Sequence, residues 1–332
     1  MIEKSATTTF EKPLNATNGT PKRHKGDKFL NRKRSSMLFY ILIMLLPIVQ
    51  FVLMYICVNI NSIFLAFKEY TTEGTYIWLE QPFQNFQEVF KDITDSKTFG
   101  YALENSLILC VCTLLINIPL SLFFSYYIFK GFPGNKFYRI VLYLPNIVSS
   151  IVMVTIFNYI FENAIPELSV LLFGGKEPNG LISDPNTSLA CLIAFNVLFS
   201  FGSITMVFSS SMSSINTSVI EAATLDGCDR LQEFIYVIFP LTFNVIKLQL
   251  IAALVGIFTN QLNLYAFFDV YADPSLYTIG YYLYRGTLSS GPSGYPYYAA
   301  MGVVLTFVAV PIILGIRQLF DRFDPYTDKG RA

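Results

Sequence analysis

This sequence is poor in charged residues. Only 14% of its 332 residues are charged and 53% are hydrophobic, whereas soluble domains carry about 25% charged residues. The shortage indicates that much of the chain never meets water. The formal net charge is zero, so bulk charge does not favour a nucleic-acid partner.

Groups that perform chemistry are also scarce. The one histidine is His24, and the sequence has neither an H-E-x-x-H metal motif nor a G-x-x-x-x-G-K-S/T phosphate loop. An enzyme would need nucleophile–base pairs or metal ligands. We therefore expect no catalytic site, no metal site and no ATP site in this chain. The five cysteines lie in or beside apolar runs, where we expect small buried side chains and no disulfides.

Long hydrophobic runs, in contrast, dominate the sequence. Six stretches contain no Asp, Glu, Lys, Arg or His: 35–67, 105–129, 140–161, 185–220, 248–268 and 286–316. Each reaches the roughly 20 residues that cross a bilayer as a helix. Backbone groups in lipid must pair within their own segment, and the runs lack the alternation of barrel strands. We therefore expect an all-α polytopic membrane protein with helices at about 37–58, 106–128, 137–161, 188–208, 245–267 and 299–319.

The placement of lysine and arginine predicts the orientation. Basic residues gather before the first helix, between the second and third, and after the sixth, and cytoplasmic segments carry the excess of Lys and Arg. We therefore expect both termini in the cytoplasm. Residues 1–34 form a polar, basic leader that we expect to be disordered, and 35–332 form the transmembrane domain. The alternation of spans then places the loop at about 209–244 on the cytoplasmic side.

That loop contains a pattern typical of two short helices with a break. Ser218 can cap the first helix, with Glu221 three residues later closing a capping box. Gly227 suits a left-handed helix end. Asp229 can cap the second helix, with Gln232 at the reciprocal position. The residues alone leave two interpretations open: a short helix that docks in the groove of a partner, or a hairpin packed under the membrane without a partner.

The same loop resembles the EAA loop of importer permeases in the ABC superfamily. That family has Glu-Ala-Ala, three residues, Gly, nine residues, Ile, one residue and Leu-Pro. The residues that match in type and spacing are Glu221, Ala222, Ala223, Gly227 and Pro240, and Asp226 is common in the sugar-importing branch. Val237 and Phe239 replace the usual Ile and Leu. Ser214-Ile215-Asn216 occupies the place where the family often has Ile-Pro, and Asn216 is a departure from that pattern. A Leu-Pro element at Pro145 resembles the third helix of the family.

The resemblance implies a function and a set of partners. It implies the fold of a type I importer permease in a bacterial or archaeal cytoplasmic membrane, which translocates carbohydrate, a di- or oligosaccharide above all, by alternating access. A second permease subunit, expected to form a heterodimer, two ATPase subunits that bind ATP and Mg, and an extracellular solute-binding protein would complete the transporter. The residues implied to contact the ATPase are Glu221, Ala222, Ala223, Asp226 and Gly227.

Polar residues in the expected fifth helix suggest where substrate passes. Thr259, Asn260, Gln261 and Asn263 precede Tyr265, and sugars favour neutral hydrogen-bonding groups beside aromatic faces. Asn158 and Asn196 are further candidates. The alternative for these residues is hydrogen bonding between helices. The alternative function is an ion-coupled transporter of a small neutral solute; such proteins often place ionisable residues in the membrane, and the six stretches have none.

Overall fold

The computed structural model describes residues 26–173 and 180–322, with side chains over 37–172 and 180–322. The chain divides into two compact units, 1–60 and 61–332, which are described separately. The first unit holds α1 (Gly26–Gln50), the π-helical turn η1 (Phe51–Cys57) and the start of α2 (Val58–Leu65). Every described side chain from 37 to 60 is exposed, and a helix that is apolar all round suits lipid. Most of the expected leader, 1–25, lies outside the described residues.

The second unit begins with the end of α2 and a small hairpin of β1 (Lys68–Tyr70) and β2 (Tyr76–Trp78), in which Glu69 pairs with Ile77. It continues through α3 (Gln84–Asp95) into α4 (Lys97–Cys112), the π-helical turn η2 (Thr113–Asn117) and α5 (Ile118–Phe129). The last three run without interruption as one candidate span. This span contains the expected helix 106–128 and begins nine residues earlier.

The expected helix 137–161 is wrong as one continuous element. The structure has α6 (Asn135–Ile147), then α7 (Ser150–Tyr159), the π-helical turn η3 (Ile160–Ala164) and α8 (Ile165–Phe173). Val148 and Ser149 between α6 and α7 are extended. Pro145 removes one backbone donor from the last turn of α6, and serine is favoured where a new helix starts. The candidate span is therefore Ser150–Leu172, and α6 with Arg139 precedes it.

The next two spans border the loop that resembles the EAA loop. The fourth span is α9 (Ser188–Ser213). After α10 (Thr217–Leu225) come α11 (Arg230–Glu233), the π-helical turn η4 (Phe234–Ile238) and α12 (Phe239–Thr259), which together form the fifth span. The expected helix 245–267 is wrong at its end, because α12 stops at Thr259 and a separate short helix, α13 (Leu264–Phe268), follows.

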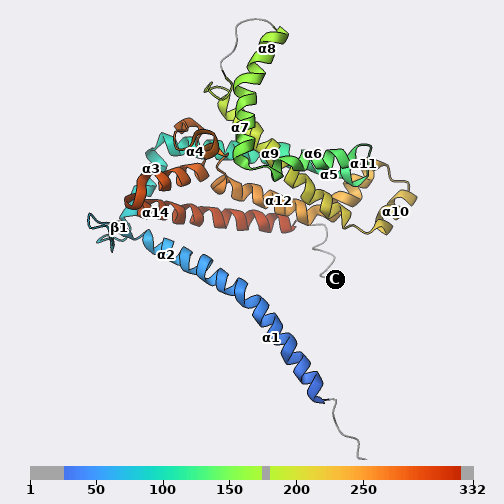
Figure 1. Cartoon of the computed structure of the whole chain (residues 1–332), viewed down its shortest axis with the longest axis horizontal. Helices are drawn as coiled ribbons and strands as arrows, with labels where there is room; N and C mark the ends of the chain where they lie inside the picture. The colour runs from blue at the N-terminus through green and yellow to red at the C-terminus, as the bar shows by residue number, and fades with distance from the viewer. Residues whose placement is uncertain (1–25, 174–179, 323–332) are drawn as a thin grey trace, which may run out of the picture. The chain divides into compact units, whose positions relative to one another are not determined.

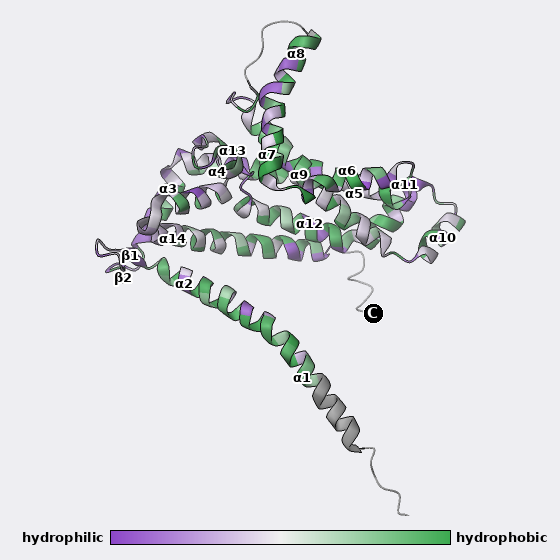
Figure 2. Cartoon of the chain, in the orientation of Figure 1, coloured by the Kyte–Doolittle hydropathy of each residue, from purple (hydrophilic) through white to green (hydrophobic). Residues whose placement is uncertain are grey.

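The last helix is interrupted once. After the 3₁₀ turn η5 (Pro274–Leu276), α14 runs from Ile279 to Arg322 with a non-helical residue at Gly291. The expected helix 299–319 lies within the part after Gly291. With it the described residues hold six helices long and apolar enough to cross a membrane, as expected. Figure 2 shows hydrophobic residues along these helices and hydrophilic residues at several of their ends.

Two apolar clusters hold the second unit together. One includes Val89, Phe99, Tyr281 and Met301 and so joins α3, α4 and α14. The other joins α5, α9, η4 and α12 through Ile118, Leu122, Phe208, Met212, Phe234, Ile238 and Ile246. In Figure 1, α5 and α6 run beside α9, and α12 runs beside α14. The second cluster therefore connects the helices on both sides of the hairpin formed by α10 and α11.

Candidate functional site

The first candidate site is the hairpin of α10 and α11. Helix α10 is capped by Asn216, whose Oδ1 accepts a 3.1 Å hydrogen bond from the backbone N–H of Ser218. The expectation that Ser218 caps this helix is therefore wrong, because the helix starts one residue before it. Asparagine is as good a cap as serine. Asn216, which stands where the family often has a proline, therefore starts α10 by capping it.

The end of α10 has the geometry that its glycine predicts. Gly227 has φ +80°, the left-handed region. Its N–H donates to the carbonyl of Thr224, and the N–H of Cys228 donates to the carbonyl of Ala223, both at 3.1 Å. This pair of bonds is a Schellman motif, which satisfies carbonyls at a helix end. Asp229 and Gln232 then form the expected capping box that starts α11.

The hairpin presents much of α10 to its surroundings. Glu221, Ala222 and Asp226 are exposed, and Leu225 near the tip is 88% exposed. Ala223 is the one residue of α10 that is buried. A short helix with acidic groups, small residues and one fully displayed leucine is suited to dock in a groove of a partner. In Figure 1, α10 lies at the opposite end of the second unit from β1.

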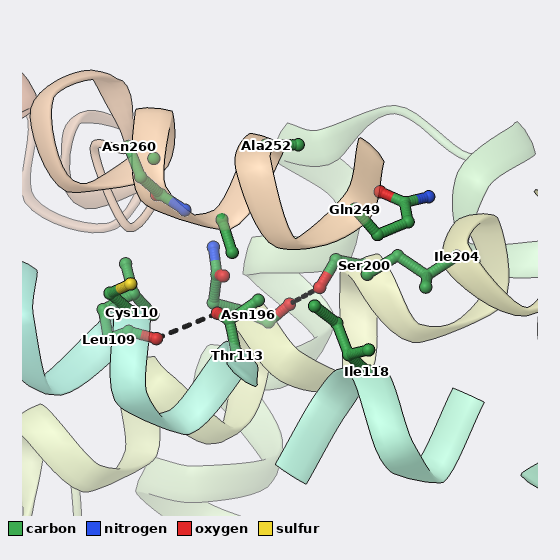
Figure 3. Close-up of a pocket in the computed structure, with 12 residues that line it drawn as sticks. Leu109, Cys110, Thr113, Ile118, Asn196, Ser200, Ile204, Gln249, Ala252 and Asn260 are labelled. Atoms are coloured by element: carbon green, nitrogen blue, oxygen red, sulfur yellow. Dashed lines mark hydrogen bonds between the residues drawn. The ribbon is translucent and has the colours of Figure 1, made fainter. Parts of the chain in front are cut away.

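The second candidate site is a cavity of about 170 Å³ between α4, η2, α5, α9 and α12. Along α12 its lining residues recur on one helical face, and α9 contributes a row at intervals of four. Figure 3 shows the labelled members of the set. The lining comprises Leu109, Cys110, Thr113, Ile118, Asn196, Ser200, Ile204, Gln249, Ala252, Ala253, Gly256 and Asn260. None of these twelve residues is charged or aromatic.

Polar groups of the cavity are fixed by a chain of hydrogen bonds. Ser200 Oγ donates to the carbonyl of Asn196 and accepts from Asn117 Nδ2, each at 2.7 Å. Thr113 Oγ1 donates to the carbonyl of Leu109 at 2.9 Å. In Figure 3 the side-chain amides of Asn196 and Asn260 point toward the space between α9 and α12. The cavity therefore offers neutral donors and acceptors on two facing walls.

Asn260 also ends the helix on which it sits. Its Oδ1 accepts a 2.8 Å bond from the N–H of Leu262, and its carbonyl accepts a 2.7 Å bond from Thr278 Oγ1. Leu262 and Asn263 both have φ in the left-handed region, at 52° and 54°. Gly280 lies so close to the end of α12 that a Cβ there would stand 2.7 Å from the Asn260 carbonyl oxygen. Contacts of Thr278 and Gly280 with the Asn260 carbonyl therefore stabilise the end of α12 at this position.

The structure separates the predicted substrate residues. Asn196 and Asn260 line the cavity. The others do not: Thr259 is exposed and donates to the carbonyl of Val255, Asn158 is exposed on α7, and Gln261 and Asn263 lie in the break. Tyr265 lies on α13, 5.2 Å from the ring of Tyr284, and a hydrogen bond to the Asp269 carboxylate raises the pKa of Tyr265 above its usual value.

Several lining residues were missed from the sequence. The missed residues Gln249 and Gly256 lie on the face of α12 that leads to the predicted Asn260, and the missed Ser200 shares one face of α9 with the predicted Asn196. Polar or small residues at helical spacing inside a membrane helix were a usable pattern, because such residues face a cavity or another helix. Thr113 and Cys110 gave no comparable pattern.

Comparisons with known proteins add to this geometry. Residues 117–329 match the family described as binding-protein-dependent transport system inner membrane component. The chain belongs to this family. The match covers the hairpin and most of the cavity, so the resemblance to ABC importer permeases is confirmed, and this is a multi-pass transport permease.

Relatives are moderately distant. The chain is 26% identical over 240 residues to the probable ABC transporter permease YesP of Bacillus subtilis, covering 70% of this chain and 76% of YesP. It is 25% identical over 224 residues to the arabinooligosaccharide permease AraP of the same organism, covering 66% and 71%. It is 25% identical over 181 residues to the maltose/maltodextrin permease MalF of Salmonella typhimurium, covering 53% of this chain and 35% of MalF.

Solved structures support the fold. A crystal structure of a bacterial ABC transporter that imports the acidic polysaccharide alginate matches with a TM-score of 0.68 and 21% identity, over 89% of this chain and 99% of the other. A crystal structure of a bacterial alginate ABC transporter in complex with alginate pentasaccharide-bound periplasmic protein matches with a TM-score of 0.68 and 22% identity, over 90% of this chain and 98% of the other. The predicted all-α importer permease fold is thus confirmed.

Proposed function

We propose that this chain is one permease subunit of an ATP-driven importer that carries a neutral di- or oligosaccharide across a bacterial or archaeal cytoplasmic membrane. One observation carries the proposal. The continuous helical segment Arg230–Thr259 begins at the exposed hairpin and contains the cavity residues Gln249 and Gly256, and Asn260 of the cavity follows it directly. A partner that moves the hairpin therefore also moves one wall of the cavity, which is what rigid-body alternating access requires.

The lining of the cavity favours a neutral ligand. Its polar groups are amides and hydroxyls, and none of its twelve residues is charged. An acidic polysaccharide such as alginate, the substrate of the matching transporter, would favour a cation there. Maltodextrins and arabinooligosaccharides, the substrates of MalF and AraP, are neutral. The family gives no support to the ion-coupled alternative.

The cavity volume supports a second permease subunit. Ligand sites commonly enclose about 300–1,000 Å³, whereas this cavity encloses about 170 Å³. We therefore propose that a second, different permease completes it. Two ATPase subunits would bind ATP and Mg and receive α10 through Glu221, Ala222, Ala223, Asp226 and Gly227, and an extracellular binding protein would deliver the sugar. With the basic loops inside, the termini and the hairpin lie in the cytoplasm.

Co-purification tests the proposal. Co-expression with the ATPase subunit and the partner permease should give a detergent-stable complex. Glu221→Lys or Asp226→Lys should release the ATPase, since each reverses an exposed charge on the hairpin. Glu73→Lys makes the same reversal at an exposed residue between β1 and β2 and should leave the complex intact. Retention of the ATPase by both hairpin variants would remove the proposed docking site.

A further inference from the structure

A partly buried ion pair joins the hairpin to a helix that is not its neighbour in sequence. Lys130 Nζ, directly after α5, lies 2.9 Å from Glu233 Oε2, the last residue of α11. The Glu233 side chain is only 5% exposed and that of Lys130 is 23% exposed. Burying two charges is costly, and such a pair is weak evidence for stability. The pair therefore calls for an explanation other than stability.

Contacts around the pair fix α11 to the end of α5. Tyr126 Oη donates a 3.0 Å hydrogen bond to the carbonyl of Arg230. The ring of Phe234 stacks on Phe123, with centroids 5.3 Å apart, and lies 5.0 Å from the ring of Tyr126. The Arg230 guanidinium lies 5.0 Å from the centroid of Phe132, in the turn after α5. Within this group the one charge-to-charge link is Lys130–Glu233.

Helix α5 in turn contacts α9, which lines the cavity on the side opposite α12. Ser125 Oγ on α5 donates to the carbonyl of Thr205 on α9 at 2.7 Å. Asn117, just before α5, donates to Ser200, which lines the cavity. The second carboxylate oxygen of Glu233, Oε1, is buried and has no hydrogen-bond partner among the described residues. That carboxylate therefore depends on Lys130 for its compensation.

Together these contacts give the hairpin two routes into the cavity. One is covalent, from α11 through η4 into α12. The other crosses from Glu233 to Lys130 and continues through α5 to α9. We propose that Lys130 and Glu233 are positioning residues that pass hairpin movement to the α5–α9 wall, so that both walls of the cavity move together when ATP is used. The proposal rests on the proposed function, because it presumes that a partner moves the hairpin.

The test uses the complete transporter in proteoliposomes and measures both ATP hydrolysis and sugar uptake. Lys130→Met leaves the buried Glu233 carboxylate uncompensated, and Glu233→Gln leaves the partly exposed Lys130 without its partner, so either single variant can disturb folding. The double variant Lys130→Met with Glu233→Gln removes both charges, a change that buried pairs often tolerate. We expect the assembled double variant to hydrolyse ATP while uptake per ATP falls by about fivefold or more, the range of energetic coupling between sites.

A control variant at an exposed lysine shows whether loss of any nearby cation lowers uptake per ATP. Lys136 is an exposed cation on α6, close to Lys130 in the sequence, and Lys136→Met should keep uptake per ATP at the wild-type value. If the double variant also keeps that value, the pair is only structural and the inference is overturned. If instead the wild-type transporter shows no ATP-driven uptake, the proposed function itself has failed.

Discussion

Asn117 at the end of η2 donates a 2.7 Å hydrogen bond from its side-chain amide to Ser200 Oγ on α9. Asn117 is buried, and its Oδ1 also accepts a bond from Ser121 Oγ at 3.3 Å. Through this one side chain, two helices that flank the cavity are kept in register. Hydrogen bonds between membrane helices usually contribute modestly, about 0.6 kcal/mol on average and up to about 1.7.

The first prediction concerns that bond. Asn117→Leu keeps similar volume but removes the donor and the acceptor, so it should lower the free energy of unfolding in detergent by about 1 kcal/mol. Asn244→Leu changes an exposed asparagine on α12 and should cost nothing. Equal unfolding curves for Asn117→Leu and wild type would show that the bond does not hold the cavity wall.

The second prediction separates two asparagines. Asn260→Asp keeps the oxygen that accepts from Leu262 but replaces the amide donor that faces the cavity with a charge. Loss of one buried hydrogen bond costs about 1–3 kcal/mol, so the sugar concentration for half-maximal uptake should rise about tenfold. Asn263→Gly tolerates the left-handed backbone and lies outside the cavity. It should transport normally, and a similar defect in both variants would contradict the assignment.

The third prediction concerns the crossing of α6 and α9. A Cβ on Gly202 would meet the carbonyl oxygen of Leu142 on α6, whereas a Cβ on Gly302 would meet nothing within 4 Å. Gly202→Ala should therefore lower the free energy of unfolding by about 1–3 kcal/mol, as overpacking does. Gly302→Ala should leave it unchanged or raise it by up to about 1 kcal/mol, because alanine favours helix. The prediction fails if the two variants unfold alike.

The fourth prediction concerns pH. Asp273 accepts hydrogen bonds from the Ser275 hydroxyl at 2.6 Å and from its N–H at 2.9 Å, and these bonds hold the pKa of Asp273 below its ordinary value of 3.8. A lowered folded pKa means that the contribution is fully present above the unfolded pKa, about 3.9, and is lost as pH falls through the folded value.

Thermal unfolding in detergent at a series of acidic pH values checks this sign. Wild type should lose more stability than Asp273→Asn as the pH falls below about 3.9, and the two should run parallel above about pH 5. Parallel curves over the whole series would mean that the Asp273 carboxylate does not stabilise the turn before α14.

The helices and the hairpin were largely predictable from the sequence. Runs without charge set the membrane spans because charge is costly in lipid, and Gly227 and Asp229 set the hairpin because each residue type suits one backbone geometry. The predicted cap of α10 was wrong because Asn216 and Ser218 are both good N-cap residues. The local sequence does not say which of the two precedes the first turn of the helix.

The two helix breaks were not predictable from hydropathy. Residues 140–161 and 248–268 are both free of charged residues and long enough to cross a bilayer, yet the chain turns at Val148 and again after Asn260. The second break depends on Thr278 and Gly280, which approach from the start of α14. The cavity was predicted only in part for the same reason. Asn196 and Asn260 could be proposed as substrate residues because they are polar, but tertiary packing decides which face of α12 lies against α9.

We propose that α10 projects into the cytosol and docks on an ATPase, and thiol labelling tests both points. Leu225→Cys, in a chain whose five native cysteines are replaced by serine, puts one thiol at an 88% exposed position on the hairpin. A membrane-impermeant maleimide should modify it in inside-out vesicles but not in right-side-out vesicles, and bound ATPase should protect it. Labelling from the outer face would place the hairpin outside the cell, and labelling that the ATPase leaves unchanged would mean that α10 is not its docking site.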